Sequence, residues 1–564
     1  MRLLAFVLLA AAASAQPSRN DSGRPLLPEQ AAIDVTYADI DLSLDIENRS
    51  IQGSVVTEAR VVQPTATLVF DLDAPLAVTA AEEVGYVVGT GEEIALPRRF
   101  ARDEHRVRIH LGRTVQPGQG VRVRIAYRGQ PRVAPNPPWE GGVTWAETVS
   151  GDPWVAVSCQ MNGADLWWPV KDHPSDEVDS LRISLRVPEA LRAIANGVSE
   201  GRETHGDGTA TEHWFVSQPI NNYGVSFGVG PFETVTADYE SPAGWRQPVP
   251  FFVLPENADD ARRQLPGFLD AMAFLERTFG PYPWRADGYK LLHTPYLGME
   301  HQTLVAYGSD FQDNEYGFDW LHYHELAHEW WANLATAPDW RDFWVHESFA
   351  NYAEALYAED IARRRDGDDA AAAAYLRYMQ RSRDRMRNEI PLAPRETRTA
   401  QQMYGVERGG NPDIYTKGGW VLHTLRWHLN DDVRFFAALR SLLYPTELDE
   451  ATTDGRQARF VSTADVLAAF SRVAGRDLSD VFEVYVRQPE LPLLSVEGSP
   501  TEVRLRWVLP ESVADRTFDV PVEVAIDGQR QRIAMTGGSG AFAVSANSDV
   551  EIDPDGRVLF ELLD

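Results

Sequence analysis

The hydrophobic period of this 564-residue chain changes twice along its length, and this restricts the folds open to it. Across residues 33–232, apolar and polar residues alternate in short runs separated by turn residues, as in VRVRI at 121–125. A period of two is typical of half-buried antiparallel strands. Across residues 259–486 apolar residues recur at helical spacing, and beyond Pro489 the alternation returns. The order is therefore β, then helical, then β.

This order and the length of the chain predict a multidomain α+β protein. A chain of this length exceeds what one hydrophobic core usually supports. The sequence has no internal repeat of about 20–50 residues, which disfavours a solenoid. We predict an all-β domain at residues 16–235, a mainly helical domain at 236–489 and a small β-sandwich at 490–564.

Charge and cysteine content exclude some classes of function. The chain has 83 acidic and 53 basic residues, a formal net charge of −30, whereas binding to a phosphate backbone needs clustered cations. We therefore expect no nucleic-acid partner. The one cysteine, Cys159, permits neither an intrachain disulfide nor a thiolate metal cluster. Only Lys171, Lys290 and Lys417 are lysines, so the other basic residues are arginines.

The first 15 residues have the layout of a secretory signal peptide. Met1-Arg2 is a short positive region, residues 3–13 are apolar, and Ala13-Ser14-Ala15 is a small-x-small cleavage site. We therefore expect export to the periplasm or the medium. No later stretch approaches about 18 uninterrupted apolar residues, so we expect no membrane anchor.

The segment His324-Glu325-Leu326-Ala327-His328 is the strongest functional signal. On a helix, positions i and i+4 share one face, so His324 and His328 can bind one metal ion. Glu325 is rotated from His324 by about 100°. That offset suits a carboxylate that takes a proton from a metal-activated water, rather than a third ligand.

A second helix-like segment, residues 344–355, supplies the third ligand. Glu347 lies 19 positions after His328, and a loop followed by an antiparallel return helix would bring its carboxylate back to the ion. Two imidazoles and one carboxylate leave a fourth position for water, which indicates a catalytic site. Other divalent metals use such ligands, but this set favours one Zn²⁺ per chain.

Neighbouring polar residues are expected to have structural roles. Adjacent helix positions point about 100° apart, so we expect His322 and His346 to face away from the ion. Glu329 and Glu354 are expected to be hydrogen-bonded or solvated carboxylates.

Together these residues resemble the aminopeptidase N and leukotriene epoxide hydrolase family of zinc metallopeptidases, the gluzincin aminopeptidases. Four motifs carry the resemblance: HELAH at 324–328 followed by Glu347, Gly298-Met299-Glu300-His301, Tyr415-Thr416-Lys417-Gly418, and Trp168-Pro169 with Asp172 and Pro174. The resemblance covers essentially the whole mature chain. It implies a saddle-like N-terminal β domain, a thermolysin-like zinc domain and the β-sandwich, a short three-domain form. The family's Asn after Glu300 is His301 here.

The resemblance also implies roles for individual residues. Glu300 would hold the free α-ammonium of a peptide by a charge-assisted hydrogen bond, with Gln160 as a second candidate. Gly298 and Met299 would lie along the substrate backbone, where a glycine allows close approach. Tyr415 would stabilise the oxyanion of the transition state. Three further tyrosines are expected to pack between helices: Tyr352, Tyr357 and Tyr404.

The sequence thus predicts an exported zinc aminopeptidase that hydrolyses the N-terminal peptide bond of peptides with a free N-terminus. One alternative is a thermolysin-like endopeptidase, for which the 298–301 match would be coincidence. Another is hydrolysis of an epoxide or other non-peptide substrate at the same site. A third is a non-catalytic binding protein on a degenerate scaffold. The preferred side chain and the oligomeric state do not follow from the sequence.

Overall fold

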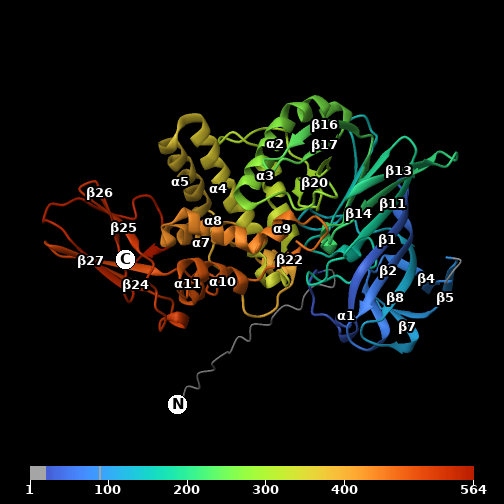
Figure 1. The fold of residues 1–564 in the computed structure, drawn as a ribbon, viewed down its shortest axis with the longest axis horizontal. Helices are drawn as coiled ribbons and strands as arrows, with labels where there is room; N and C mark the ends of the chain where they lie inside the picture. The colour runs from blue at the N-terminus through green and yellow to red at the C-terminus, as the bar shows by residue number, and fades with distance from the viewer. Residues whose placement is uncertain (1–20, 88–90, 104, 564) are drawn as a thin grey trace, which may run out of the picture.

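The computed structural model describes residues 21–87, 91–103 and 105–563, and it has the α+β multidomain class that the sequence predicts. The proposed signal peptide, residues 1–15, lies outside the described residues. A β-rich region, a helical region and a smaller β-rich region follow one another along the longest axis (Figure 1). No helix in the described part of the chain is both long and apolar enough to cross a bilayer.

The N-terminal region is built from stacked sheets. Its elements are α1 (Pro28–Ala31), β1 (Ile33–Asp45), β2 (Ser50–Val61), β3 (Thr65–Asp71), β4 (Leu76–Tyr86), β5 (Glu93–Pro97), β6 (Arg99–Arg102), β7 (Arg106–Val115), β8 (Gly120–Gly129), β9 (Gly142–Glu147), β10 (Pro153–Ser158), β11 (Leu181–Pro188), β12 (Arg192–Ala195), β13 (Val198–Thr204), β14 (Thr209–Val216) and β15 (Phe227–Gly230). The largest sheet has the order β13-β14-β11-β1-β2-β8-β4-β5. Sheets of order β12-β15-β10-β9 and β3-β7-β6 accompany it.

The alternating sequence pattern has its expected consequence in these strands. In β8, Val121, Val123, Ile125 and Tyr127 are buried, while the residues between them are at least partly exposed. The Tyr127 hydroxyl donates to the carbonyl of Trp167 (2.9 Å), which holds the loop after β10 against the large sheet.

The helical region begins with a small sheet. Its elements are β16 (Glu233–Glu240), β17 (Arg246–Val253), α2 (Ala258–Phe279), β18 (Lys290–His293), β19 (Gly298–Met299), β20 (Leu304–Tyr307), α3 (Trp320–Ala327), β21 (Ala335–Thr336), α4 (Trp344–Asp366), α5 (Asp368–Arg383), α6 (Ala400–Tyr404), α7 (Thr416–Leu429), α8 (Asp432–Leu443), α9 (Glu447–Ala451), β22 (Arg459–Phe460), α10 (Thr463–Ala474) and α11 (Ser479–Tyr485). The sheet has the order β16-β17-β18-β20-β19. The predicted division at residue 235 falls inside β16.

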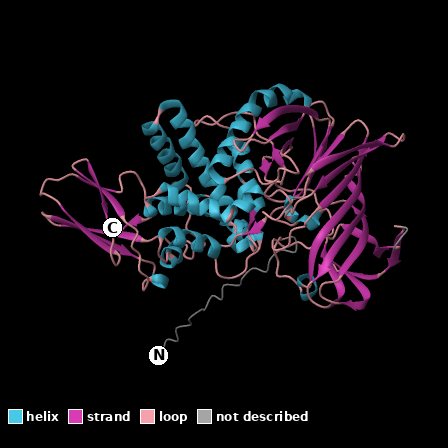
Figure 2. Ribbon diagram, viewed as in Figure 1, coloured by secondary structure: helices cyan, strands magenta, loops and turns pink. Residues whose placement is uncertain are grey.

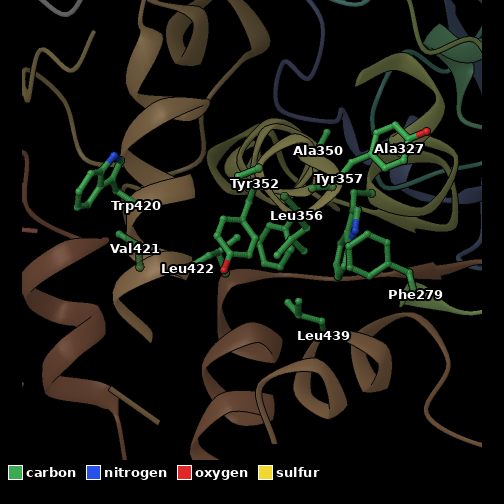
Figure 3. Packing of buried hydrophobic residues seen from close by; sticks show 14 of the residues in the cluster. Phe279, Ala327, Ala350, Tyr352, Leu356, Tyr357, Trp420, Val421, Leu422 and Leu439 are labelled. Carbon is green, nitrogen blue, oxygen red and sulfur yellow. The ribbon is translucent and has the colours of Figure 1, made fainter. Parts of the chain in front are cut away.

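Helix α4 lies at the centre of the helical core (Figure 3). Tyr352, Leu356 and Tyr357 on α4 are buried, and the same core contains residues of α7 and α8. The Tyr352 hydroxyl lies 2.8 Å from that of Tyr375 on α5, and the Tyr357 hydroxyl donates to Asp270 on α2 (2.8 Å). Both tyrosines therefore pack between helices, as predicted. The packing fixes the helix that carries Glu347.

The chain ends in short strands beyond the helices (Figure 2). These are β23 (Leu493–Gly498), β24 (Glu502–Val508), β25 (Val522–Ile526), β26 (Gln529–Ile533), β27 (Ser539–Ala543), β28 (Val550–Ile552) and β29 (Glu561–Leu562). They form sheets of order β27-β24-β23-β29 and β26-β25-β28. The Lys417 ammonium on α7 donates to the carbonyls of Gln488 (3.0 Å) and Pro489 (2.6 Å), which anchors the connection to this region.

Residues 21–24, here called the N-terminal strap, run between the β-rich and helical regions. The Ser22 amide donates to the carbonyl of Met161 (3.2 Å), and its carbonyl accepts from the amide of Ala400 on α6 (3.0 Å). The Asp21 carboxylate accepts from the hydroxyl of Thr399 and from the amide of Gln401 (3.1 Å). The strap therefore ties the start of α6 to the β-rich region.

Candidate active site

The helix that carries the two motif histidines has a well-defined start and end. The side chain of Asp319 accepts from the amide of His322 (3.0 Å) and so caps the N-terminus of α3. The helix ends at Ala327, and the chain leaves helical geometry at Trp331 and Ala332, where φ is −109° and 158°. His324 and His328 thus project from the last turn of α3.

Helix α4 returns past α3 in the antiparallel sense that the sequence predicts. The Tyr323 hydroxyl on α3 donates to the carbonyl of Ala353 on α4 (3.0 Å), whereas His328, directly after the end of α3, lies beside Glu347, which comes earlier on α4. Glu347 and Glu354 lie seven positions apart, about two helical turns, so both carboxylates face α3.

Three ligand atoms converge between these helices. Nε2 of His324 and Nε2 of His328 are 3.2 Å apart, and each lies 3.4 Å from Oε2 of Glu347. A tetrahedral zinc ion with ligand bonds of about 2.0–2.1 Å holds its ligand atoms about 3.3 Å apart. These three atoms, here called the metal triangle, are therefore as far apart as three ligand atoms bound to one zinc ion.

The hydrogen bonds behind the histidines favour a metal over direct contact. Nδ1 of His324 lies 2.9 Å from Glu354 Oε1, and Nδ1 of His328 lies 2.8 Å from the carbonyl oxygen of Trp331. Both oxygens accept, so each Nδ1 carries the proton and each Nε2 presents a lone pair in the neutral ring. Oε2 of Glu347 is buried and has no hydrogen-bond partner among the described residues. A cation between these three atoms satisfies all of them.

The electrostatics of the triangle favour added positive charge. Burial lowers the pKa of both histidines, but the surrounding carboxylates raise it by more. The pKa of His324 is raised by Glu347 and Glu354. The pKa of His328 is raised by Glu300 and Glu347. Burial would raise the pKa of Glu347, but both histidines hold it below its usual range. A field that favours a proton here also favours a metal cation.

Glu325 faces the same space from the neighbouring helix position. One ligand atom each of Glu300, Glu325 and His328 lie within 4.8 Å of one another. Burial, with the nearby carboxylates, raises the pKa of Glu325 to about 8 despite the opposing histidines. A Cβ at Gly298 would lie 2.8 Å from Oε1 of Glu325, so only glycine lets the strand pass this close.

The carboxylate of Glu300 is held by residues from the N-terminal region. Oε1 accepts from Nε2 of Gln160 and from the hydroxyl of Tyr223 (3.0 Å). The segment reaches the site through β19, the last strand of the order β16-β17-β18-β20-β19. Burial raises the pKa of Glu300, whereas His328 opposes this shift. Its side chain is 2% exposed and faces the metal triangle.

Two tyrosines close the other side of the site. The hydroxyl of Tyr415 donates to that of Tyr404 (3.4 Å), which lies 2.6 Å from Gln160 Oε1 and 3.2 Å from Glu347 Oε1. The expectation that Tyr404 packs between helices is therefore wrong. The short α6 carries it to the edge of the metal triangle.

The neighbouring histidines point elsewhere, as expected from helical geometry. His322 stacks on Phe268, with ring centroids 3.7 Å apart. Nε2 of His346 accepts from the amide of Ala337 (2.8 Å). His301 is buried, and its two ring nitrogens have no hydrogen-bond partner among the described residues.

Three residues at the site were not singled out from the sequence. Glu354 orients His324 and was expected only as a hydrogen-bonded or solvated carboxylate. Its position seven residues after Glu347, on the same helical face, was the available signal. Tyr223 and Tyr404 come from distant segments, and nothing in their local pattern distinguishes them from core tyrosines.

The predicted site residues all line one cavity of about 230 Å³, here called the zinc-site cavity. They are Gln160, Gly298, Met299, Glu300, His324, Glu325, His328, Glu347 and Tyr415. A second cavity of about 430 Å³ shares Trp320, His324 and Tyr415 with it. A cleft therefore extends to two sides of the metal triangle.

Known proteins share both the sequence and the fold. The Peptidase M1 N-terminal domain matches residues 35–223, and the Peptidase family M1 domain matches residues 273–485. Leucyl aminopeptidase of Saccharolobus solfataricus is 21% identical over 66% of this chain and 46% of its own length. Glutamyl aminopeptidase of Bos taurus is 23% identical over 71% and 42%, and aminopeptidase B of Homo sapiens is 23% identical over 76% and 67%.

The chain thus spans less than half the length of the first two of these relatives. The crystal structure of an M1 zinc metallopeptidase from Deinococcus radiodurans superposes with a TM-score of 0.64 at 25% identity, covering 84% of this chain and 99% of that one. The two domain matches together cover most of this chain, including every predicted metal ligand. The protein therefore belongs to the M1 family of zinc metallopeptidases.

Proposed function

We propose that the protein is a zinc aminopeptidase that releases the first residue of peptides with a free N-terminus. One observation carries this proposal: the Glu300 carboxylate faces the same cavity as the metal triangle, within 4.8 Å of atoms of Glu325 and His328. In a peptide, the α-amine and the first carbonyl are separated by a single Cα. A carboxylate this close to the metal can therefore hold the amine while the first carbonyl lies at the reacting position.

The chain's own residues divide the chemistry between them. Zinc bound by His324, His328 and Glu347 would polarise the carbonyl and make water more acidic. Glu325 takes a proton from the attacking water and passes it to the leaving amine. The ionised form of Glu325 that this role needs is favoured by positive charge at the triangle.

Tyr415 is placed to stabilise the oxygen that gains charge. Its phenol lines the zinc-site cavity beside His324, with ring centroids 6.1 Å apart. A neutral donor in a buried site stabilises a developing oxyanion more than it stabilises the ground-state carbonyl. Tyr404, which contacts both Tyr415 and Glu347, acts through them as a positioning residue.

The test compares Glu325→Gln with the wild type and with Glu389→Gln, a matched change at an exposed residue. Glu325→Gln should keep one zinc per chain by metal analysis but lose turnover of aminoacyl-amide substrates. Both wild type and Glu389→Gln should lose activity with a chelator and regain it with zinc. Near-wild-type turnover by Glu325→Gln would refute the mechanism.

A second variant separates an aminopeptidase from an endopeptidase. Glu300→Gln should lower kcat/KM for free-amine substrates much more than for N-acetylated ones, because only the former carry the ammonium that it binds. Two results together would favour the thermolysin-like endopeptidase. The wild type would cleave an acetylated peptide efficiently at an internal bond, and Glu300→Gln would lower kcat/KM equally for free-amine and N-acetylated substrates.

We also propose that the protein is exported. The basis is the signal-peptide layout of residues 1–15. Mass spectrometry of the protein from its native host should find the mature chain beginning at Gln16. A chain that retains Met1 in the cytoplasm would refute this.

A further inference from the structure

The second cavity lies where the leaving part of a substrate would go, if the proposed function is correct. The amine is held at Glu300 in the zinc-site cavity, so the chain beyond the first peptide bond must continue past the metal on another side. The 430 Å³ cavity adjoins the metal triangle through His324 and Tyr415 and does not contain Glu300. Its volume is within the usual range for small-molecule pockets. We call it the leaving-side cavity.

This cavity contains buried polar atoms that the protein itself does not satisfy. The hydroxyls of Tyr316 and Ser382 are inaccessible to water and have no hydrogen-bond partner in the described part of the chain. Their side chains lie at the cavity wall, and the two residues are 8% and 7% exposed. Because a carboxylate oxygen is about as large as a water molecule, these two hydroxyls lie behind the cavity wall and do not reach a ligand in this conformation.

The charges around the cavity are unequally paired. Arg381 forms an ion pair with Glu315. The Glu354 carboxylate accepts hydrogen bonds from Nδ1 of His324 and from the hydroxyl of Tyr378. Arg385 also lines the cavity, and no carboxylate among the residues with described positions lies within ion-pair distance of it. One guanidinium therefore remains available to an incoming anion.

We propose that the leaving-side cavity binds a carboxylate in the departing part of the substrate, with Arg385 as its charged partner. A guanidinium pairs with a carboxylate through two parallel hydrogen bonds, so a carboxylate fits the unpaired Arg385 at the cavity wall. The carboxylate has two possible sources. It is either the C-terminus of a dipeptide or tripeptide, or an acidic side chain following the scissile bond.

Matched substrates distinguish these sources. One N-terminal residue is kept, and kcat/KM is compared for the dipeptide Leu-Ala, its amide Leu-Ala-NH₂, and Leu-Asp-NH₂. A C-terminal source predicts that kcat/KM for Leu-Ala exceeds that for its amide by at least about tenfold, the lower end of what one charge-assisted hydrogen bond contributes. A side-chain source predicts the same preference for Leu-Asp-NH₂ over Leu-Ala-NH₂.

Variants then assign the preference to the cavity. Arg385→Gln should bring the ratio of kcat/KM for the carboxylate substrate to that for the amide substrate towards one. Arg128→Gln, which removes an exposed arginine from β8 in the N-terminal region, should leave the ratio unchanged. A wild-type ratio near one for both pairs, or a ratio that survives Arg385→Gln, would overturn the inference.

Failure of the proposed function looks different. In that case the zinc-loaded wild type would not hydrolyse Leu-Ala-NH₂ or any other free-amine substrate. If Leu-Ala-NH₂ is cleaved without any carboxylate preference, the aminopeptidase proposal stands and only the carboxylate site is refuted.

Discussion

Replacing Glu354 should weaken zinc binding without touching a ligand. Its Oε1 lies 2.9 Å from Nδ1 of His324, and both residues are largely buried. The carboxylate holds the ring in the tautomer that directs the Nε2 lone pair into the triangle and makes that nitrogen more basic. Glu354→Ala removes both effects.

The size of the loss follows from the surroundings. Loss of such a partner typically costs 10–100-fold in metal affinity, about 1.4–2.7 kcal/mol. Glu354 lines the leaving-side cavity, so water can enter and replace part of the lost hydrogen bond. We therefore expect about 30-fold weaker zinc binding for Glu354→Ala, within the typical range. For Glu354→Gln, which keeps an oxygen acceptor but not the charge, we expect less than tenfold.

The assay is competition between the metal-free protein and a fluorescent zinc chelator, which needs no turnover. Glu359→Gln is the matched control, because it lies on the same helix but pairs with Arg363 and Arg426 away from the metal. It should bind zinc as the wild type does. A Glu354→Ala protein whose zinc Kd is within twofold of the wild type would show that the tautomer argument is wrong.

Two further predictions concern the tyrosines and the strap. Tyr415→Phe should lower kcat by at least about tenfold with little change in KM, because its phenol acts on the transition state. Tyr404→Phe should lower kcat by less than Tyr415→Phe does. If steady-state kinetics show the larger loss of kcat in Tyr404→Phe, then Tyr404 and not Tyr415 stabilises the transition state. Burial raises the pKa of Asp21 from 3.8 to about 6, so its ionisation destabilises the folded state as pH rises through this interval. Between pH 4.5 and 7.5 the wild type should lose about 2 kcal/mol relative to Asp21→Asn in urea unfolding, and parallel pH profiles would contradict this.

The metal triangle could be predicted because its geometry is local. The spacing of His324 and His328 places both on one helix face whatever surrounds the helix. Glu347 required one further step, the return helix, and the sequence contains only a short loop between the two helical patterns. This part of the site therefore requires only that two helices close in sequence pack against each other.

The rest of the site depends on contacts between distant segments. Tyr404 lies on a five-residue helix whose placement no local pattern reveals. Tyr223 meets Glu300 from 77 positions away. The strands β18 and β20 were also missed, because every residue in them is buried and such short apolar runs have no distinguishing period.

The N-terminal strap has a consequence for the order in which the molecule is completed. Asp21 and its partner Thr399 are 378 positions apart, so the first described residues of the chain find their place only after the helical region has been synthesised. Closing so long a loop is entropically costly until the intervening regions have folded. The start of α6, and with it the hydroxyl of Tyr404, is therefore among the last parts to be secured. The metal triangle, which α3 and α4 bring together, does not need this contact, so the zinc ligands and the tyrosine hydroxyl beside them are held in place by separate parts of the chain.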